Sequence, residues 1–372
     1  MRRSVIVVLL LSLLAACGTQ QPSASQPTGA PQPSALAASS APAQPTAAAR
    51  RLTVMTHDSF SVSEDVLKGF EKQENATVQV LKSGDAGAAL NKATLSKNSP
   101  LADVFFGVDN TFLSRALKAG IFEPYAAPAL KEIPDRFKLD PSNSLVPIDY
   151  GYVSLNYDKQ FLLQNNLAPP SKLEDLTKPE WKGKLVVENP ATSSPGLAFM
   201  LTTIAQFGTS GSYTWLDYWR DLRKNDVLVT DGWEDAYNTQ FSGSAGKGPR
   251  PLVVSYASSP PVEVLFSKEQ LKEAPTGVIT SGSFLQIEFA GVLRGTQQRD
   301  LAERFIDYML SKPFQEDMPL QMFVYPVLPN AALPDLFKQF STLPDQPLAI
   351  PPEQIDQNRE QWLDAWTKTV LR

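Results

Sequence analysis

From about residue 50 onward, short β-prone runs alternate with helical patterns, and this alternation limits the folds open to the chain more than any other feature. The predicted strands that run into a polar junction and then a helical pattern lie at 51–56, 78–81, 103–108, 184–188, 227–230 and 252–256. Such alternation is typical of an α/β fold with a parallel or mostly parallel sheet. Ligands bind in such sheets beyond the carboxyl ends of the strands, where these junctions lie.

The first residues of the chain have the layout of an export signal. Arg2 and Arg3 precede an apolar run at 5–16, which is too short to span a bilayer as a stable helix. The run ends in Leu-Ala-Ala-Cys, which resembles the bacterial lipobox, so Cys17 is expected to be diacylated and to become the new N-terminus. The alternative is an ordinary signal peptide with a chance cysteine at its cleavage site.

A tether is predicted between the lipidated cysteine and the folded part. Residues 18–49 are rich in Pro, Ala, Ser, Gln and Thr and contain no charged residue. A segment of this composition buries too little surface to offset its ordering entropy. We therefore expect a signal peptide at 1–16, a lipidated Cys17 with a disordered tether at 17–50, and an exported lipoprotein that faces the periplasm or the cell exterior.

Composition excludes several classes of function. The chain has one cysteine and one histidine, so it forms no internal disulfide and lacks the ligands of the usual His/Cys zinc sites. Lys and Arg number 34 against 39 Asp and Glu, and the net charge of -5 argues against a nucleic-acid partner. These counts favour a binding protein over an enzyme, with no metal and no cofactor.

A Ser-Ser-Pro tripeptide occurs twice between a predicted strand and a predicted helix, at 193–195 and at 258–260. Serine at the N-cap followed by proline is a preferred helix start. Helix N-termini of this kind hold anions or polar ligand atoms. The alternative is that each tripeptide only caps its helix.

Several segments together resemble the solute-binding proteins of bacterial ABC importers, and specifically the thiamine-binding ones. The most specific stretches are Asp-Tyr-Gly-Tyr at 149–152, Gly-Trp-x-x-Ala-Tyr at 232–237 and Ser-Tyr-x-x-Ser-Pro at 255–260. The remaining matching segments lie at 55–60, 107–110, 192–197 and 324–327. They occur in the family's order and cover nearly everything after residue 50.

The resemblance implies a two-lobed type 2 periplasmic-binding protein fold with a hinge between the lobes. Lobe one is expected at 51–150 plus 287–372 and lobe two at 151–286, with the chain crossing near Gly151 and Phe284. The implied function is extracytoplasmic capture of thiamine or its phosphates in the cleft between the lobes. The implied partners are the permease and ATPase of a membrane ABC importer, and the protein is expected to be a monomer.

A binding site for thiamine requires aromatic faces, a carboxylate and hydroxyl or N–H donors. The resemblance implies ligand-binding roles for His57, Asp58, Asp85, Ala86, Ser193, Ser194, Trp233, Tyr256, Ala257, Ser258, Ser259, Pro260 and Phe323. Asp85 is expected as the carboxylate partner, although it could only cap its helix, and Trp233 could only pack its lobe. His57 is expected to act in its neutral form, because an imidazolium would repel a thiazolium.

Other functions remain open at this point. An exported hydrolase could use His57, Asp58 and Ser59, but adjacent residues do not readily form a catalytic relay. A ferric-iron binder could recruit Tyr256 with Asp58 or Glu288. A polyamine binder would use several carboxylates and aromatic rings. The sequence favours thiamine binding over each of these.

Overall fold

The computed structural model describes residues 50–372, so the predicted signal peptide, Cys17 and nearly all of the tether lie outside the described residues. Its strands are β1 (Arg50–Thr56), β2 (Ala76–Lys82), β3 (Val104–Asp109), β4 (Phe122–Glu123), β5 (Val146–Asp158), β6 (Leu185–Glu188), β7 (Leu228–Thr230), β8 (Leu252–Tyr256), β9 (Thr276–Leu293) and β10 (Tyr325–Pro326). The strands predicted to precede polar junctions are therefore present, with ends that differ by at most two residues.

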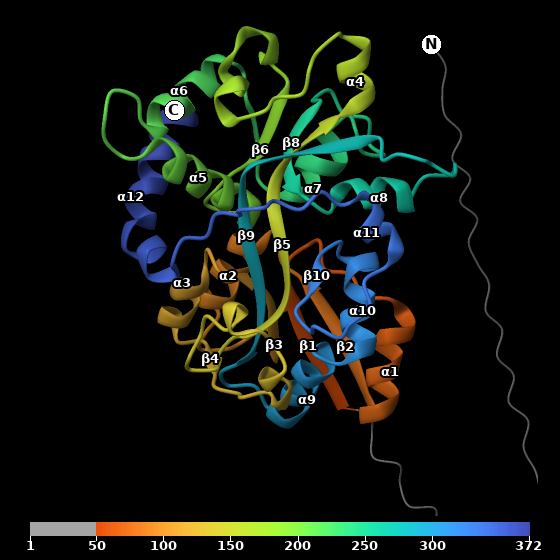
Figure 1. The fold of residues 1–372 in the computed structure, drawn as a ribbon. Coiled ribbons are helices and arrows are strands. Elements are labelled where there is room, and N and C mark those ends of the chain that lie inside the picture. Colours follow the sequence, from red (N-terminus) through yellow and green to blue (C-terminus); the bar gives the residue numbers. More distant parts are fainter. Residues whose placement is uncertain (1–49) are drawn as a thin grey trace, which may run out of the picture. The chain divides into compact units, whose positions relative to one another are not determined.

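Helices follow most of these strands (Figure 1). The α-helices are α1 (Glu64–Glu74), α2 (Ala86–Leu95), α3 (Leu113–Ala119), α4 (Lys159–Gln164), α5 (Ser194–Phe207), α6 (Trp215–Lys224), α7 (Trp233–Asp235), α8 (Ser259–Leu265), α9 (Arg299–Met309), α10 (Lys312–Gln321), α11 (Asp335–Phe340) and α12 (Pro352–Val370). Short turns of other helix types are η1 (Pro128–Lys131), η2 (Asp135–Phe137), η3 (Leu173–Thr177), η4 (Pro179–Trp181) and η5 (Ala236–Gln240). None of these helices is long and apolar enough to cross a membrane, a finding that covers residues 50–372.

All strands belong to one sheet with the order β2-β1-β3-β9-β5-β8-β6-β7, with β4 paired to β9 and β10 paired to β5. The pairs β1–β2, β1–β3, β6–β7 and β6–β8 are parallel, as predicted. The expectation of a mostly parallel sheet is wrong in the middle, where β5 and β9 run antiparallel to each other and to their neighbours. The reason is that the chain passes along β5 and returns along β9.

The strand β9 is longer than its sequence predicts. Two separate strands, 278–280 and 284–293, are expected from the apolar runs, because Ser281, Gly282 and Ser283 interrupt them. In the structure one strand of 18 residues runs through this interruption. Gly282 takes a φ of +78°, a conformation that L residues rarely adopt, and the pairing with β5 shifts register nearby.

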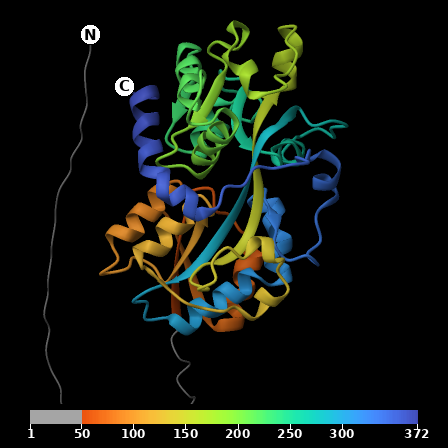
Figure 2. The ribbon, with the colours of Figure 1, turned by 60° about the vertical axis from the view of Figure 1, so that its left-hand side comes forward.

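The long strands β5 and β9 join two lobes (Figures 1 and 2). The first lobe holds β1–β4 with α1–α3, α9 and α10, and the second holds β6–β8 with α4–α8. Gly151 and Phe284, the predicted crossing points, lie within β5 and β9. A further segment crosses at Leu348, whose amide donates to Ser283 O at 2.7 Å and whose carbonyl accepts from the Leu285 amide at 2.8 Å. The sequence did not predict this third connection.

The C-terminal helix α12 contacts both α3 and α6. The Trp366 side chain is fully buried and meets Trp219 of α6 edge-on at a centroid distance of 5.4 Å. Toward the first lobe, the Arg359 guanidinium lies 5.1 Å from the ring centroid of Phe112. The apolar residues of this amphipathic helix, Ile355, Trp362, Trp366 and Val370, are buried in the core.

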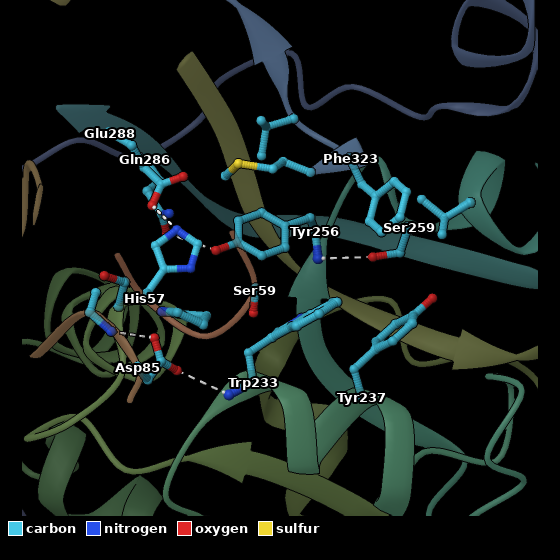
Figure 3. A pocket seen from close by; sticks show the side chains of 16 residues that line it. His57, Ser59, Asp85, Trp233, Tyr237, Tyr256, Ser259, Gln286, Glu288 and Phe323 are labelled. Atoms are coloured by element: carbon cyan, nitrogen blue, oxygen red, sulfur yellow. Dashed lines mark hydrogen bonds and ion pairs between the residues drawn. The ribbon is translucent and has the colours of Figure 1, made fainter. Parts of the chain in front are cut away.

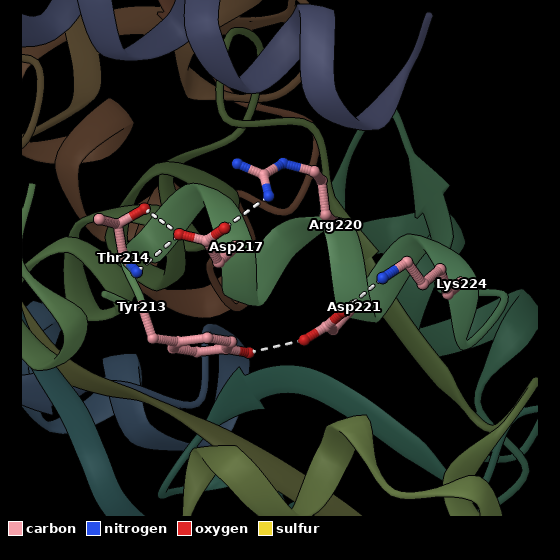
Figure 4. A network of polar contacts seen from close by, with 6 residues as sticks. All are labelled: Tyr213, Thr214, Asp217, Arg220, Asp221 and Lys224. Carbon is pink, nitrogen blue, oxygen red and sulfur yellow. Dashed lines mark hydrogen bonds and ion pairs between the residues drawn. The ribbon is translucent and has the colours of Figure 1, made fainter. Parts of the chain in front are cut away.

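Polar contacts fix the start of α6 (Figure 4). The amide and hydroxyl of Thr214 donate to one oxygen of Asp217 at 2.8 and 2.7 Å, and Arg220 pairs with the other oxygen at 2.5 Å. These bonds satisfy N–H groups that a helix start leaves without intrahelical partners. Beyond them, Tyr213 and Lys224 both bond to Asp221. Trp219 of the same helix faces α12.

Candidate functional site

A cavity lies where the strand-to-helix junctions of the two lobes meet β9 and the segment before β10 (Figure 3). It encloses about 600 Å³, part of it open to solvent. Its lining consists of His57, Ser59, Asp85, Ala86, Ser194, Pro195, Trp233, Tyr237, Tyr256, Ser259, Val262, Gln286, Glu288, Met322, Phe323 and Val324. Eight of the thirteen residues with predicted ligand-binding roles are in this set.

A second hollow of about 620 Å³ adjoins the cavity and shares Trp233, Tyr237 and Phe323 with it. We call it the outer hollow. It also contains Glu234 and Glu263, which do not line the inner cavity. The approach to the cavity is therefore acidic on this side.

Aromatic rings form one wall of the cavity. The rings of Trp233 and Tyr237 stack with centroids 5.0 Å apart and planes 12° apart, and the Tyr256 ring lies 6.4 Å from Trp233 at 61°. Trp233 Nε1 donates to Ser255 Oγ at 2.9 Å, and the Tyr256 hydroxyl donates to Gln286 Oε1 at 3.2 Å. Because hydrogen bonds fix the polar edges of Trp233 and Tyr256, their faces are held ready for a flat or cationic ligand.

Asp85 both caps a helix and joins the lobes. Its Oδ1 accepts a hydrogen bond from the Ala86 amide at 2.6 Å, and its Oδ2 accepts one from the Trp233 amide at 3.0 Å. Burial raises the pKa of Asp85 despite these bonds. Nearby, the Gly87 amide of α2 donates to Thr192 O at 2.9 Å. The N-cap side chain and the first turn of α2 are thus both hydrogen-bonded to the second lobe.

His57 follows β1 directly and is 7% exposed. Its Nε2 lies 3.3 Å from Glu288 Oε1. Burial alone would lower the pKa of His57, but the carboxylates of Glu288, Asp85 and Asp58 outweigh it and the pKa is raised. Gly107, at a bulge in β3 with φ +100°, makes room for the ring, because a Cβ there would collide with it.

The strand β9 supplies a side of the cavity that contains none of the residues predicted to bind thiamine, since the sequence suggests Glu288 only as a ligand for ferric iron. Gln286 and Glu288 are 2% and 5% exposed and both line the cavity. Glu288 pairs across the sheet with Asp149 of β5. Burial, and then the charge and hydrogen bonding of Glu288, raise the pKa of Asp149 well above its usual range. Gln286 and Glu288 lie on either side of Ile287 in an otherwise apolar run. Two polar residues on one face of a predicted strand are the sequence signal that could have identified this side of the cavity.

The two Ser-Ser-Pro tripeptides contribute one serine each to the cavity. Helices α5 and α8 begin at Ser194 and Ser259, one residue earlier than predicted, and these two serines line the cavity. Ser193 and Ser258 precede the helices and are fully buried. Ser259 Oγ lies 2.9 Å from Ser255 Oγ, which in turn accepts from Trp233.

Five of the predicted residues do not line the cavity: Asp58, Ser193, Ala257, Ser258 and Pro260. Asp58 is exposed, and its Oδ1 accepts from the Gly84 amide at 2.9 Å. It therefore anchors the loop before α2. Ala257, Ser258 and Pro260 are buried around the start of α8. Since His57 and Ser59 line the cavity and Asp58 does not, the adjacent trio does not converge on one point.

Phe323 borders both the cavity and the outer hollow. Its backbone has a φ of +62°, which is strained for an aromatic residue. The Phe266 ring meets it edge-on at 5.8 Å. This backbone conformation places an aromatic ring at the boundary between the two hollows.

The charge of the lining is uneven. It contains Asp85 and Glu288 but no Lys or Arg among the described residues. Within residues 50–372, no group of three or more His, Cys, Asp or Glu side chains is arranged to hold a metal ion. The cavity therefore combines aromatic faces with carboxylates, a chemistry that suits a small, flat, positively charged molecule.

Known proteins resemble this chain in sequence and in structure. The model of the bacterial extracellular solute-binding protein family matches residues 99–341. The chain is 32% identical to a thiamine-binding periplasmic protein of Escherichia coli strain K12, over 86% of this chain and 94% of the relative. A thiamine-binding periplasmic protein of Salmonella typhimurium strain LT2 is 31% identical, over 89% and 96%.

Among solved structures, one described as a periplasmic thiamin binding protein superposes with a TM-score of 0.76 and 30% identity. The match covers 88% of this chain and 98% of that one. The agreement extends over both lobes and the two long strands, so it concerns the fold as a whole. The predicted two-lobed type 2 fold is confirmed, and the chain belongs to the family of bacterial extracellular solute-binding proteins.

Proposed function

We propose that this protein captures thiamine outside the cytoplasm, in the cavity between its lobes, and delivers it to a membrane ABC importer. The observation that carries the proposal is the wall of Trp233, Tyr237 and Tyr256 beside carboxylates, in a lining without Lys or Arg. Its relatives at 31–32% identity over most of the chain are named for thiamine binding, which supports the same ligand. Membership of a solute-binding family argues for binding without turnover.

In this proposal the thiazolium cation lies against the aromatic faces. Cation–π attraction and the nearby carboxylates favour a positive ring over a neutral one. The Ser194 hydroxyl, at the start of α5, is the expected contact for the hydroxyethyl arm or its phosphate. Ser194→Ala should then weaken a phosphorylated ligand more than free thiamine, and equal losses would argue against a phosphate role.

We propose a hinge for ligand entry and release. The expected lobe boundaries are 51–150 plus 287–372 and 151–286, so that bending occurs where β5 and β9 pass between the lobes. Ligand would stabilise the arrangement in which Asp85 reaches Trp233. The contact of α12 with both α3 and α6 means that opening also involves the C-terminal helix.

Export and anchoring complete the proposal. The periplasmic relatives support an exported protein. Lipidation of Cys17 would hold it at the membrane, within reach of its permease and ATPase, and the protein would act as a monomer without a cofactor. Mass spectrometry of the membrane fraction tests this: a diacylated N-terminal Cys17 is expected, and a soluble protein cleaved elsewhere would contradict it.

Calorimetry with a panel of ligands tests the binding function. The panel contains thiamine, its monophosphate and diphosphate, Fe(III) and spermidine, because ferric-iron and polyamine binders share this fold. Thiamine or one of its phosphates should bind at micromolar concentration or below. Binding of Fe(III) or spermidine in their place would replace the proposal, and hydrolysis of the phosphates would favour an enzyme.

A further inference from the structure

Two neighbouring side chains of β9 face the cavity together. Successive side chains of a strand point to opposite faces, so Gln286 and Glu288 emerge on the same face. Both are more than nine-tenths buried and both line the cavity (Figure 3). They lie on β9, one of the two long strands that pass between the lobes.

Glu288 is positioned as a hydrogen-bond acceptor. On one side it faces Nε2 of His57 at 3.3 Å, and on the other it neighbours the buried Asp149 across the sheet. Burial, and then the charge of Glu288, raise the pKa of Asp149 and favour its protonated form.

Gln286 is positioned as a donor. Its Oε1 accepts the hydrogen bond of the Tyr256 hydroxyl at 3.2 Å. This contact occupies the amide oxygen and leaves the NH₂ group available. Among residues 50–372, no side chain or carbonyl accepts a hydrogen bond from that nitrogen. The cavity thus presents a donor and an acceptor side by side.

Asp85 is less suited to this task. The resemblance to thiamine-binding proteins implies that it is the carboxylate partner of the ligand, but each of its oxygens already accepts a backbone hydrogen bond. Glu288 accepts no backbone hydrogen bond within the described part of the chain. The acceptor for a ligand amino group is therefore better sought on β9 than on α2.

We propose that Glu288 and Gln286 recognise the aminopyrimidine ring of thiamine, with Glu288 accepting from the exocyclic amino group and Gln286 donating to the adjacent ring nitrogen. The inference rests on the proposed function and identifies the part of the ligand that β9 contacts. An amino group next to an unprotonated ring nitrogen offers a donor beside an acceptor. This is the complement of the Glu288–Gln286 pair.

Oxythiamine is the probe that separates this recognition from the rest of the site. It replaces the amino group by an oxo group and carries a proton on the adjacent ring nitrogen, so its donor and acceptor are exchanged. Its thiazolium and hydroxyethyl arm are unchanged. Mismatched buried polar groups are costly, so the wild-type protein should bind thiamine at least tenfold more tightly than oxythiamine.

The test is calorimetry of both ligands with the full mature chain and two variants. Glu288→Gln turns the acceptor into a side chain that can also donate, and should reduce the thiamine preference at least tenfold. Gln286→Met removes the donor without altering the charges around Asp149, and should also reduce it. Circular dichroism establishes whether each variant is folded. If Glu288→Gln does not fold, Gln286→Met alone provides the test.

Glu263→Gln is the matched control. Glu263 accepts from the Tyr237 hydroxyl at 2.8 Å in the outer hollow, so the same change of charge occurs away from the inner cavity. The ratio of thiamine affinity to oxythiamine affinity in Glu263→Gln should stay within twofold of the wild-type ratio. Equal wild-type affinities for the two ligands, or unchanged ratios in both β9 variants, would overturn the inference while leaving thiamine binding intact. Failure of the wild-type protein to bind thiamine would instead overturn the proposed function and, with it, this inference.

Discussion

The Asp85 carboxylate accepts hydrogen bonds from the Ala86 amide at 2.6 Å and from the Trp233 amide at 3.0 Å, although Asp85 and Trp233 are 148 residues apart in sequence. One side chain therefore ties the start of α2 in the first lobe to the start of α7 in the second. Its two bonds run to opposite sides of the cleft that holds the cavity. The contact gives a physical basis for coupling lobe closure to ligand binding.

Asp85→Asn should weaken thiamine binding by about 1–3 kcal/mol, because its NH₂ group would face a backbone donor. Calorimetry measures the affinity, and small-angle scattering measures the compaction that ligand produces, which should be smaller in the variant. Asp135→Asn is the control, since the Asp135 side chain is exposed and does not line the cavity. Wild-type affinity in Asp85→Asn would exclude a role in closure.

Trp233→Ala should lower the affinity for thiamine by about 1–3 kcal/mol, because it removes both a stacking face and the support of the Tyr237 ring. Trp233→Phe should lose less, since it keeps an aromatic face and gives up only the bond to Ser255. Titration calorimetry and the Tm of each variant separate the two roles. A lower Tm with unchanged affinity would make Trp233 a packing residue only.

Thiamine affinity should increase as pH rises from 6 to 8. Burial lowers the pKa of His57, but the carboxylates of Glu288, Asp85 and Asp58 outweigh it, so the pKa is raised. As pH rises through this pKa, the imidazolium loses its proton, its repulsion of the thiazolium ends and Glu288 becomes free of its ion pair. Calorimetry in buffers of different ionisation enthalpy should detect proton release on binding.

His57→Phe is the control for this pH dependence. The variant keeps a planar ring against Phe106, which lies 5.5 Å from the His57 ring. Its affinity should vary little between pH 6 and 8. Persistence of the wild-type slope in His57→Phe would assign the titration to another group.

The free energy of unfolding should fall as pH rises from about 4 to 8. Burial raises the pKa of Asp109 to about 7, so the folded protein binds this proton more tightly than the unfolded chain does. The stabilisation is fully present below the pKa of the unfolded chain and is lost as pH rises through about 7. At about 1.4 kcal/mol per pKa unit, Asp109 accounts for at most about 4 kcal/mol.

Urea unfolding at pH 5 and pH 8 measures this loss. Asp109→Asn keeps an oxygen that can accept from Thr111 and Phe112, and it should reduce the difference between the two pH values. Asp135→Asn, at an exposed aspartate, controls for the loss of one charge. An unchanged difference in Asp109→Asn would attribute the effect to the other buried carboxyls, Asp149 and Glu188.

Much of the fold could be predicted because its strand-to-helix junctions are local features. His57, Asp85, Trp233 and Tyr256 lie at such junctions, and the resemblance to thiamine-binding proteins implied their ligand-binding roles. All four line the cavity. The ligand role of each stays a prediction. Within such loops, a single step along the chain decides whether a side chain faces the cavity, which is why Asp58 points away although His57 does not.

The rest of the fold and of the candidate site depends on contacts between residues that are distant in sequence. Gln286 and Glu288 lie inside an apolar strand, and only the pairing of β9 with β5 brings them to the cavity beside Asp149. The ring of Tyr237 reaches the cavity through its stacking on Trp233. The crossing at Leu348 has no pattern of its own, because it pairs through a single bridge to Phe284. Local periodicity contains no information about such pairings.

Titration of the purified mature protein with thiamine by calorimetry at pH 8 tests the central claim most directly. The account predicts one site per chain with a dissociation constant in the micromolar range or below, and a loss of affinity in Trp233→Ala. No detectable binding at millimolar thiamine, by a protein whose circular dichroism and Tm report a folded state, would contradict it.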